Sequence, residues 1–401
     1  MYRERTVKIS ELIFLGSLYI TQTIGFSFFI EALVSILRKN NAPLQNISFI
    51  YLLGFFWLFK FLWAPVVDRF SPLKRWKYKG WLILIQLLSI ATLIATAGFS
   101  VKNDLIPIAM MGLSIGFLSS THDVVVDALA YGLLSEKDRG IGNAVKTAGG
   151  MLGAMVGGGI GLMLYEYFGW EICIYILTGV TSVSLLQLFL FKEPEFRPQV
   201  QSRSGYVTYF FRYWKQGRLK WFILLLYYPI GIYIGYSLIA PILVDSGWRL
   251  DAIGLVVNFI GAAVGAVAAF MTGYIVRRFG RRNVLVWLSV FQGVAIMLLL
   301  LITKGHNNVF IVLLSVCLII ITYSPSATIL FTIMMDQVSA EKPATDYAMQ
   351  HSLYLMVGFI SGFGGTALSG YIGYSSVVAA AALLAFGSAL ASAFLYRPHT
   401  V

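Results

Sequence analysis

Four ionisable residues fall within long apolar stretches of this 401-residue sequence. They are Glu31, Lys60, Asp123 and Lys146. A charge in such surroundings is costly, and where a helix crosses a membrane it commonly binds a substrate or carries protons. Pairing of Asp123 with Lys60 or Lys146 would also hold helices together, and the sequence leaves both roles open. Two lysines against one aspartate leave a positive excess, which an anionic substrate group or another carboxylate would balance.

Tyrosines, a glutamine and a histidine add candidate binding groups. Tyr228 and Tyr233 share one apolar stretch, and Tyr323 lies in another. Tyrosine offers both a stacking face and a hydroxyl to a ligand. Gln350 and His351 lie about two turns into a third stretch, where the histidine would titrate near neutral pH. Packing and membrane-interface anchoring are the alternative explanations for these side chains.

The composition indicates that helices in a membrane carry these residues. Hydrophobic residues make up 58% of the chain and charged residues 12%, about half the charged fraction of a soluble domain. Apolar runs of the length that an α-helix needs to cross a bilayer recur throughout, whereas the strands of a membrane β-barrel would alternate polar and apolar residues. We therefore expect an all-α polytopic membrane protein with twelve spans. The predicted spans are 10–36, 47–67, 78–98, 104–132, 141–166, 169–192, 219–244, 252–276, 283–303, 308–336, 345–372 and 375–396.

Basic residues predict the orientation of these spans. Placing both termini in the cytoplasm puts most of the 30 Lys and Arg residues on the cytoplasmic side, as the positive-inside rule requires. Because the net charge of +12 resides in short loops, nucleic-acid binding is not expected. The basic start of the chain has no cleavage site after it, so the first span is expected to be retained. Neither Cys173 nor Cys317 suggests a disulfide, and no metal or cofactor is expected.

The longest polar stretch divides the predicted spans into two halves. We expect an N-terminal six-helix half at 1–192, a cytoplasmic linker at 193–218 and a C-terminal six-helix half at 219–401. The halves echo each other in the same direction. Asp127 recurs 209 residues later as Asp336. At the slightly shorter offset of 205, Gly153 and Gly157 recur as Gly358 and Gly362, and Lys146 aligns with His351.

Charged residues near the cytoplasmic ends of the spans predict a gate. Asp127 is expected within reach of Arg69 or Arg139, and Asp336 within reach of Arg281 or Arg282. Such pairs would hold the inner side shut in one state of a transport cycle. The predicted gate residues are Asp68, Arg69, Asp127, Arg139, Arg281, Arg282 and Asp336. A second helix feature is the run Gly149, Gly153 and Gly157, whose spacing predicts close helix contact.

These motifs resemble a known family. The loop Ala64-Pro65-Val66-Val67-Asp68-Arg69-Phe70 after the second span, and Gly280-Arg281-Arg282 in the second half, resemble the acidic-basic loops of the major facilitator superfamily. Arg277 stands where an acid is usual. The run from Lys60 to Phe70, the segment His122-Asp123-Val124-Val125-Val126-Asp127-Ala128, and Glu136-Lys137-Asp138-Arg139-Gly140 resemble its AmpG-like branch. The chain length is closer to the RhtX/FptX-type siderophore permeases of that branch.

The resemblance implies a monomeric secondary transporter of the bacterial inner membrane rather than an enzyme. It predicts two parallel six-helix halves and alternating access. The expected function is proton-driven import of a siderophore or its ferric complex, with protons and membrane lipids as the other partners. The alternatives are an anhydro-muropeptide permease, then drug efflux, which Ala154 disfavours because it replaces the proline of the antiporter motif. His122 and Asp127 have the spacing of an acyltransferase motif, but no nucleophile accompanies them. A non-transporting receptor or assembly factor is the remaining alternative.

Overall fold

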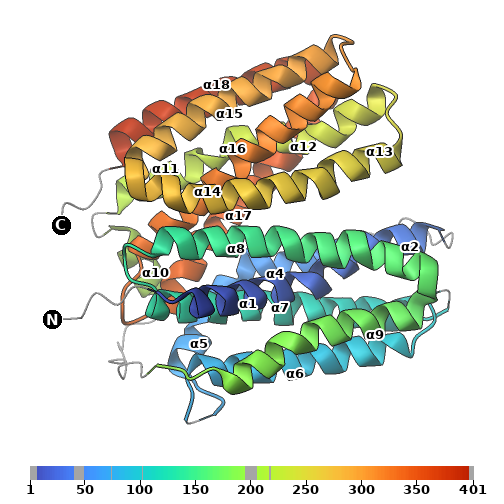
Figure 1. Ribbon diagram of the computed structural model, residues 1–401. Helices are drawn as coiled ribbons and strands as arrows, with labels where there is room; N and C mark the ends of the chain where they lie inside the picture. Colours follow the sequence, from blue (N-terminus) through green and yellow to red (C-terminus); the bar gives the residue numbers. More distant parts are fainter. Residues whose placement is uncertain are drawn as a thin grey trace. The chain divides into compact units, whose positions relative to one another are not determined.

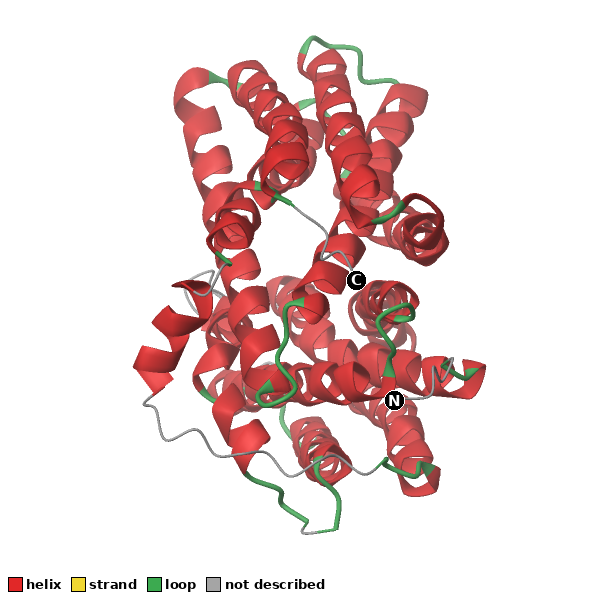
Figure 2. Ribbon diagram, turned by 90° about the vertical axis from the view of Figure 1, so that its left-hand side faces the viewer, coloured by secondary structure: helices red, strands yellow, loops and turns green. Residues whose placement is uncertain are grey.

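The computed structural model describes residues 7–39, 49–73, 75–101, 103–194, 206–215 and 218–396. Within these ranges the regular structure is helical, with no β-strand (Figure 2). The chain divides into two compact units. Unit 1 comprises residues 1–200 with 337–348, and unit 2 comprises residues 201–336 with 349–401. The sequence predicted a linker at 193–218, of which residues 195–205 and 216–217 lie outside the described residues.

Unit 1 contains eight labelled α-helices and four short π- or 3₁₀-helical turns among its described residues (Figure 1). The helices are α1 (Ile9–Ser27), α2 (Leu33–Lys39), α4 (Leu53–Phe59), α5 (Ala64–Arg69), α6 (Tyr78–Ala97), α7 (Leu105–Leu133), α8 (Arg139–Ala154) and α9 (Gly161–Leu190). The turns are η1 (Phe28–Ala32), η2 (Phe49–Leu52), η3 (Lys60–Leu62) and η4 (Met155–Ile160).

The helices of unit 2 follow in chain order, and one π-helical turn interrupts them. They are α10 (Tyr206–Lys215), α11 (Leu219–Tyr227), α12 (Pro229–Asp245), α13 (Leu250–Gly254), η5 (Leu255–Ile260), α14 (Gly261–Phe279), α15 (Arg281–Thr303), α16 (Val309–Asp336), α17 (Pro343–Ile372) and α18 (Tyr374–Leu395). The boundary between the units falls inside α17, whose first residues, 343–348, belong to unit 1 and include Thr345, which bonds Asp68 of the same unit. The sequence had placed the whole of 219–401 in one half.

The observed helices follow the predicted spans closely. Ten helices in the described part of the chain are long and apolar enough to cross a membrane. One of them, Arg139–Leu190, contains a break at Gly169, and Figure 1 shows the chain reversing its direction and returning as the rest of α9, which packs beside α6. The second predicted span appears as the shorter apolar helix Leu53–Leu62. Counting the broken stretch twice and adding this helix gives the twelve predicted crossings.

Two turns between helices depend on glycine in corresponding places of the two units. Gly169 breaks α9 at φ 77°, and Gly373 precedes α18 at φ 80°. A residue with a Cβ seldom adopts this left-handed region. The two glycines are 204 residues apart, almost the offset that relates Gly153 to Gly358. This agreement supports the parallel repeat that the sequence predicted.

Glycines of α8 and η4 let these segments approach α1 closely, which confirms the predicted glycine contact. A Cβ at Gly153 would meet the backbone of Ile20, and one at Gly157 would overlap the carbonyl oxygen of Ile24. Gly149 packs in the same way against the side chain of Tyr19. Backbone contact of this kind fixes α1 against α8 without large side chains between them.

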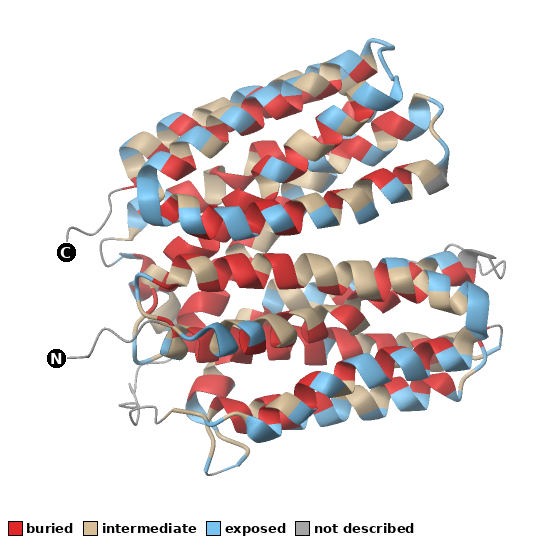
Figure 3. Cartoon of the chain, viewed as in Figure 1, coloured by how far each residue is buried: buried red, intermediate tan, exposed pale blue. Residues whose placement is uncertain are grey.

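Buried and exposed residues alternate along the helices of each unit (Figure 3). Both interiors are apolar: Phe28 and Leu53 of unit 1, and Ile296 and Leu299 of unit 2, are fully inaccessible. Many residues that face outward are apolar too, such as Leu190, whose exposed fraction is 85%. Such surfaces are suited to lipid, which has no penalty for apolar contact.

Candidate functional site

A cluster of four buried charges lies inside unit 1. Lys60 forms an ion pair with Asp123 Oδ2, and Lys146 Nζ lies 2.5 Å from Asp127 Oδ2 and 3.4 Å from Asp123 Oδ1. The side chains of Lys60 and Asp123 are fully inaccessible, and the other two are at most 6% exposed. Two positive and two negative charges therefore balance within one site. Asp127 supplies the second carboxylate that the two lysines require.

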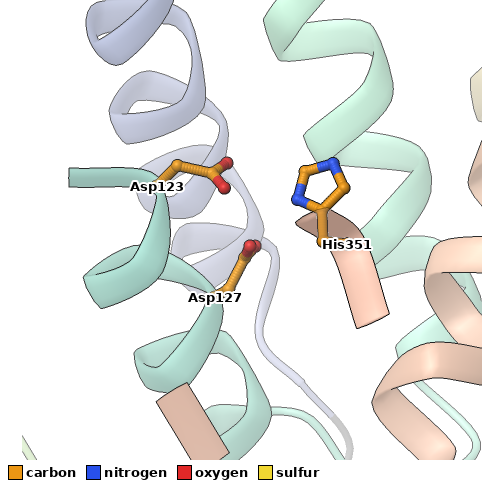
Figure 4. Close-up of side chains that lie close together, drawn as sticks. All are labelled: Asp123, Asp127 and His351. Carbon is orange, nitrogen blue, oxygen red and sulfur yellow. The ribbon is translucent and has the colours of Figure 1, made fainter. Parts of the chain in front are cut away.

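Helix geometry brings these charges together. Asp123 and Asp127 are one helical turn apart on α7, and Figure 4 shows both carboxylates extending from the same side of the helix. Lys146 comes from the middle of α8. Lys60 begins η3, where the helix after α4 tightens to a 3₁₀ turn, and its ammonium group lies 5.2 Å from the ring centre of Trp57. Three separate elements thus contribute to the cluster.

Uncharged polar groups complete the hydrogen bonds of the two carboxylates. Tyr19 donates its hydroxyl to Asp127 Oδ1 at 3.0 Å, and Gln22 donates its amide to Asp123 Oδ1 at 2.9 Å. Lys146 also lies over the ring of Tyr347, 4.7 Å from the ring centre, and 3.4 Å from its hydroxyl. Buried charges persist only when paired and hydrogen-bonded in this way, so the cluster is a coherent network.

The cluster contains groups that can exchange partners. Lys146 contacts both aspartates, so protonation of one carboxylate still leaves it a charged partner. A substrate anion could likewise replace a carboxylate as the partner of either lysine. Such an arrangement couples a change of protonation or ligand to a change of helix contacts. The chemistry that it supports is binding and proton transfer.

The structure corrects the predicted partner of Asp127. The sequence placed Asp127 in the gate with Arg69 or Arg139, but its carboxylate pairs with Lys146 and Tyr19. The reason is the helical register, which turns Asp127 to the same side of α7 as Asp123 and into the interior. Arg69 is exposed, with no ion-pair partner among the described residues. The guanidinium of Arg139 lies 5.0 Å from the ring centre of Tyr131.

Asp68 binds the beginning of α17 rather than an arginine. Its two carboxylate oxygens accept the backbone N–H of Ala344 at 3.1 Å and that of Thr345 at 2.8 Å, and the Thr345 hydroxyl at 2.6 Å. These N–H groups have no partner within their own helix, so the carboxylate acts as a cap supplied from elsewhere in unit 1. Burial raises the pKa of Asp68 to about 6, and the hydrogen bonds from Thr345 and Ala344 offset part of that rise.

The predicted partner of Asp336 is confirmed in unit 2. Arg281, at the start of α15, contacts both oxygens of Asp336 at the end of α16, with Nε at 2.6 Å and a terminal nitrogen at 3.0 Å. This two-point contact suits the planar guanidinium. Arg282 instead donates to the carbonyl oxygen of Ala393 near the end of α18. Of the predicted gate residues, Asp68, Asp127 and Arg139 therefore have contacts within unit 1, whereas Arg281, Arg282 and Asp336 have contacts within unit 2.

Glu31 lies apart from the charge cluster. It belongs to the π-helical turn η1, and its carboxylate packs against Gly158 in the π-helical turn η4. A Cβ at Gly158 would overlap this carboxylate, so the glycine makes room for it. π-Helical turns are uncommon and frequently occur at functional sites. The predicted role of Glu31 in substrate binding or proton coupling remains a prediction.

Two predicted binding residues are held inside unit 2. The hydroxyl of Tyr228 lies 3.2 Å from Ser326 Oγ and 3.4 Å from the Leu285 carbonyl oxygen, and the residue is fully inaccessible. Gln350 accepts from the indole of Trp221 at 2.7 Å. These contacts satisfy both side chains within the fold, which favours packing over substrate binding for each.

The remaining aromatic candidates form a cluster in unit 2. The ring of Tyr233 lies 5.7 Å from that of Tyr323 and 5.6 Å from that of Tyr354. Tyr323 also stacks on Tyr236, with ring centres 5.4 Å apart. His351 is buried, and its ring lies 6.5 Å from Tyr354. We call the four tyrosines the tyrosine cluster. Sequence reasoning named Tyr233 and Tyr323 as binding candidates but not Tyr354, because Tyr354 lies on α17 and no local pattern links that helix to α12 and α16.

Several network residues were missed by sequence reasoning. Tyr19 and Gln22 are polar residues three apart in the first span, and this spacing was the available signal. Tyr347 and its 3.4 Å contact with Asn143 carried no comparable signal, because the two lie 204 residues apart in the chain. His122 was discounted together with the acyltransferase spacing, yet it lies beside Gln22.

Comparison with known sequences finds a family whose model covers most of the chain. The family model described as Major Facilitator Superfamily matches residues 12–366, which include the whole charge cluster. The anhydromuropeptide permease of Escherichia coli K12 is 28% identical over 259 residues, covering 63% of this chain and 53% of the permease. A putative transporter AmpG 2 of Rickettsia bellii is 22% identical over 83% of this chain and 84% of its own length.

Solved structures agree at the level of the fold. The human organic anion transporter MFSD10 has a TM-score of 0.75 at 15% identity, covering 96% of this chain and 98% of that one. At this identity the likeness concerns the fold alone. The expected closeness to siderophore permeases finds no support in these relatives, because the expectation rested on chain length, which does not report substrate.

Proposed function

Because this chain belongs to the major facilitator superfamily, we propose that it is a proton-coupled permease that carries an anhydro-muropeptide type of cargo into the cytoplasm. The similarity to the E. coli permease supports the cargo, although the match spans about half the length of that relative. The balanced charge cluster is the observation that carries the mechanism. We also propose that the protein lies in a bacterial inner membrane and acts as a monomer.

Asp123 is the proposed proton carrier of the cluster. Its carboxylate is bonded by Lys60, Lys146 and Gln22, and Lys146 is also paired with Asp127. A proton on Asp123 therefore weakens its bond to Lys60 and leaves the cluster with one excess positive charge. This charge would then attract an anionic group of the cargo, such as a peptide carboxylate. Proton and cargo would therefore bind together, as import of the cargo driven by a proton gradient requires.

The tyrosine cluster is the proposed contact for the sugar part of the cargo. Tyrosine rings stack on the apolar faces of sugars and present hydroxyls at their edges. The hydroxyl of Tyr323 donates to the hydroxyl of Tyr233 at 3.4 Å. Tyr323 could therefore donate to a sugar hydroxyl only after this hydrogen bond breaks. Asp68, with its hold on the start of α17, is proposed as the part of the gate that unit 1 contributes.

Uptake into proteoliposomes tests this function. With an imposed pH gradient, radiolabelled anhydro-muropeptide should accumulate above its external concentration, and ferric siderophores should not. Asp123→Asn should abolish this accumulation but keep exchange of labelled for unlabelled cargo, because exchange needs no net proton movement. Ser182→Ala is the control, since Ser182 bonds only its own helix in the described structure. Accumulation of a siderophore alone, or unchanged uptake by Asp123→Asn, would overturn the proposal.

A further inference from the structure

Unit 1 contains a small cavity next to the charge cluster. Polar side chains from α1, α6, α7 and α9 line part of it, and they include Gln22, Gln86, Ser119, His122 and Thr181; apolar atoms line the rest. Its volume is about 20 Å³, and about 10–15 Å³ is enough to hold one water. A water remains in such a cavity when it can form hydrogen bonds with these polar groups.

A buried acceptor in this lining lacks a protein partner. Gln86 is 1% exposed, and its amide nitrogen donates to Ser184 Oγ at 2.8 Å. Its Oε1 has no hydrogen-bond donor among the residues that the structure describes. Leaving a buried acceptor unpaired is costly, and a water in the cavity can supply the missing donor.

The hydrogen bonds from Gln86 to Asp123 have one consistent direction. Gln22 donates its amide N–H to the carboxylate, so its Oε1 must accept from His122 Nδ1, 3.3 Å away. A neutral His122 with its proton on Nδ1 then accepts at Nε2, which faces the Gln86 amide nitrogen at 3.4 Å. The bonding pattern assigns this tautomer. Every donor in the line points toward Asp123.

We propose that the cavity is a built water site, and that the bound water and the line Gln86–His122–Gln22 set the proton affinity of Asp123. The water holds the Gln86 amide in the orientation that donates to His122. Donors aligned toward a carboxylate stabilise its charged form, so an intact line makes Asp123 release its proton more readily. This inference rests on the proposed role of Asp123 as proton carrier.

Other groups face Asp123 and are common to every variant compared. Within unit 1, Lys60 from η3 and Lys146 from α8 bond its carboxylate, and Tyr19 from α1, Tyr347 from the start of α17 and Asp127 from its own helix α7 lie close enough to interact with its charge. None of them lines the cavity. Changes confined to Gln86, His122 or Ser184 therefore leave these charges in place.

Infrared difference spectroscopy on the purified protein measures the proton affinity without any cargo. The carboxyl band of Asp123 is assigned as the band missing in Asp123→Asn, and its titration midpoint is followed with pH. His122→Leu removes the donor to Gln22 and should raise the midpoint by about 0.5–1 pH unit. His122→Asn places an amide where Nδ1 lies and should restore most of the shift. An unchanged midpoint in folded His122→Leu, or no restoration by Asn, would overturn the line's role.

A matched pair of serines on α9 separates the line from general packing. Ser184→Ala removes the partner of Gln86 and should raise the midpoint, whereas Ser182→Ala should not. Equal shifts in both would contradict the proposal. All variants are compared with wild type by thermal unfolding to show that they fold.

The water itself is tested by brief radiolysis in H₂¹⁸O. Hydroxyl radicals formed from a bound water should label His122 despite its 2% exposure. Absence of label on His122, while exposed residues are modified, would overturn the water site. Neither spectroscopy nor labelling requires transport. A protein that fails to carry any cargo but shows both results would refute the proposed function and keep the hydrated line.

Discussion

The bond between Thr345 and Asp68 allows a prediction whose size depends on pH. Thr345→Val keeps the shape of the side chain and removes only its hydroxyl, which donates to Asp68 Oδ2 at 2.6 Å. A hydrogen bond to a charged group contributes about 1.5–3 kcal/mol, and one between neutral groups about 0.5–1.5 kcal/mol. The substitution should therefore cost about 1.5–3 kcal/mol at pH 8, where Asp68 is ionised, and less at pH 5.

The same substitution should move the titration of Asp68. Burial raises the pKa of Asp68 to about 6, so the folded state holds this proton more tightly than the unfolded chain, in which the value is near 3.8. Stability from this group is therefore highest at low pH and is lost as the pH rises from about 4 to 6. Removing a donor to the carboxylate should raise the pKa by a further ~1 unit and extend the loss toward pH 7.

Unfolding of the purified protein in detergent at pH 5 and pH 8 measures both effects. Thr345→Ser is the control, because it keeps the hydroxyl and should behave nearly as wild type. A cost that is equal at the two pH values, or larger at pH 5, would refute an ionised Asp68 as the cap of α17. A similar loss in Thr345→Ser would indicate that packing of the methyl group, and not the hydrogen bond, is responsible.

Three further experiments test the packing and the ion pairs. Lys146→Met should cost about 3–5 kcal/mol of unfolding free energy because it leaves a buried carboxylate uncompensated. Adding Asp127→Asn should recover more than half of that cost, and simple additivity would contradict the pairing. Gly157→Ala should cost about 1–3 kcal/mol, since its Cβ overlaps the backbone of α1. Gly159→Ala should be nearly neutral in the same thermal unfolding assay, because nothing lies near its added Cβ. Arg281→Lys should cost under about 1 kcal/mol, as its partly exposed pair is weakly stabilising, and a larger loss would indicate a structural role beyond the pair.

Much of the fold follows from local properties of the sequence. Span positions came from apolar runs, whose ends depend on residues close by in the sequence. Gly169 and Gly373, which adopt the left-handed backbone conformation, lie at or next to predicted span ends. The glycine contact of α8 with α1 was predictable for the same reason, because small residues at fixed spacing need no knowledge of the partner. The membership in the superfamily rested on motifs of the same local kind.

The site was predicted less completely because it depends on which side of a helix faces which neighbour. Asp123 and Asp127 were assigned to different roles, although a spacing of four residues puts them on one face of α7. Because Asp127 lies near the end of its predicted span, the sequence suggested an arginine partner at the membrane surface. In the structure its partner is Lys146, inside unit 1. The cap that Asp68 provides for Thr345 joins residues 277 apart, which no local pattern reveals.

The neutrality of the four-charge cluster has an electrical consequence. Lys60, Lys146, Asp123 and Asp127 sum to zero when all are ionised, and to +1 when Asp123 holds a proton. Moving one charge through the full membrane voltage is worth about 2.3 kcal/mol per 100 mV. A single cargo carboxylate bound at the cluster returns this sum to zero, so neither the loaded nor the empty protein would do electrical work in its cycle. Net uptake of a cargo with one negative charge should then produce no current across membranes containing the protein; a current during such uptake would show that a further proton accompanies the cargo.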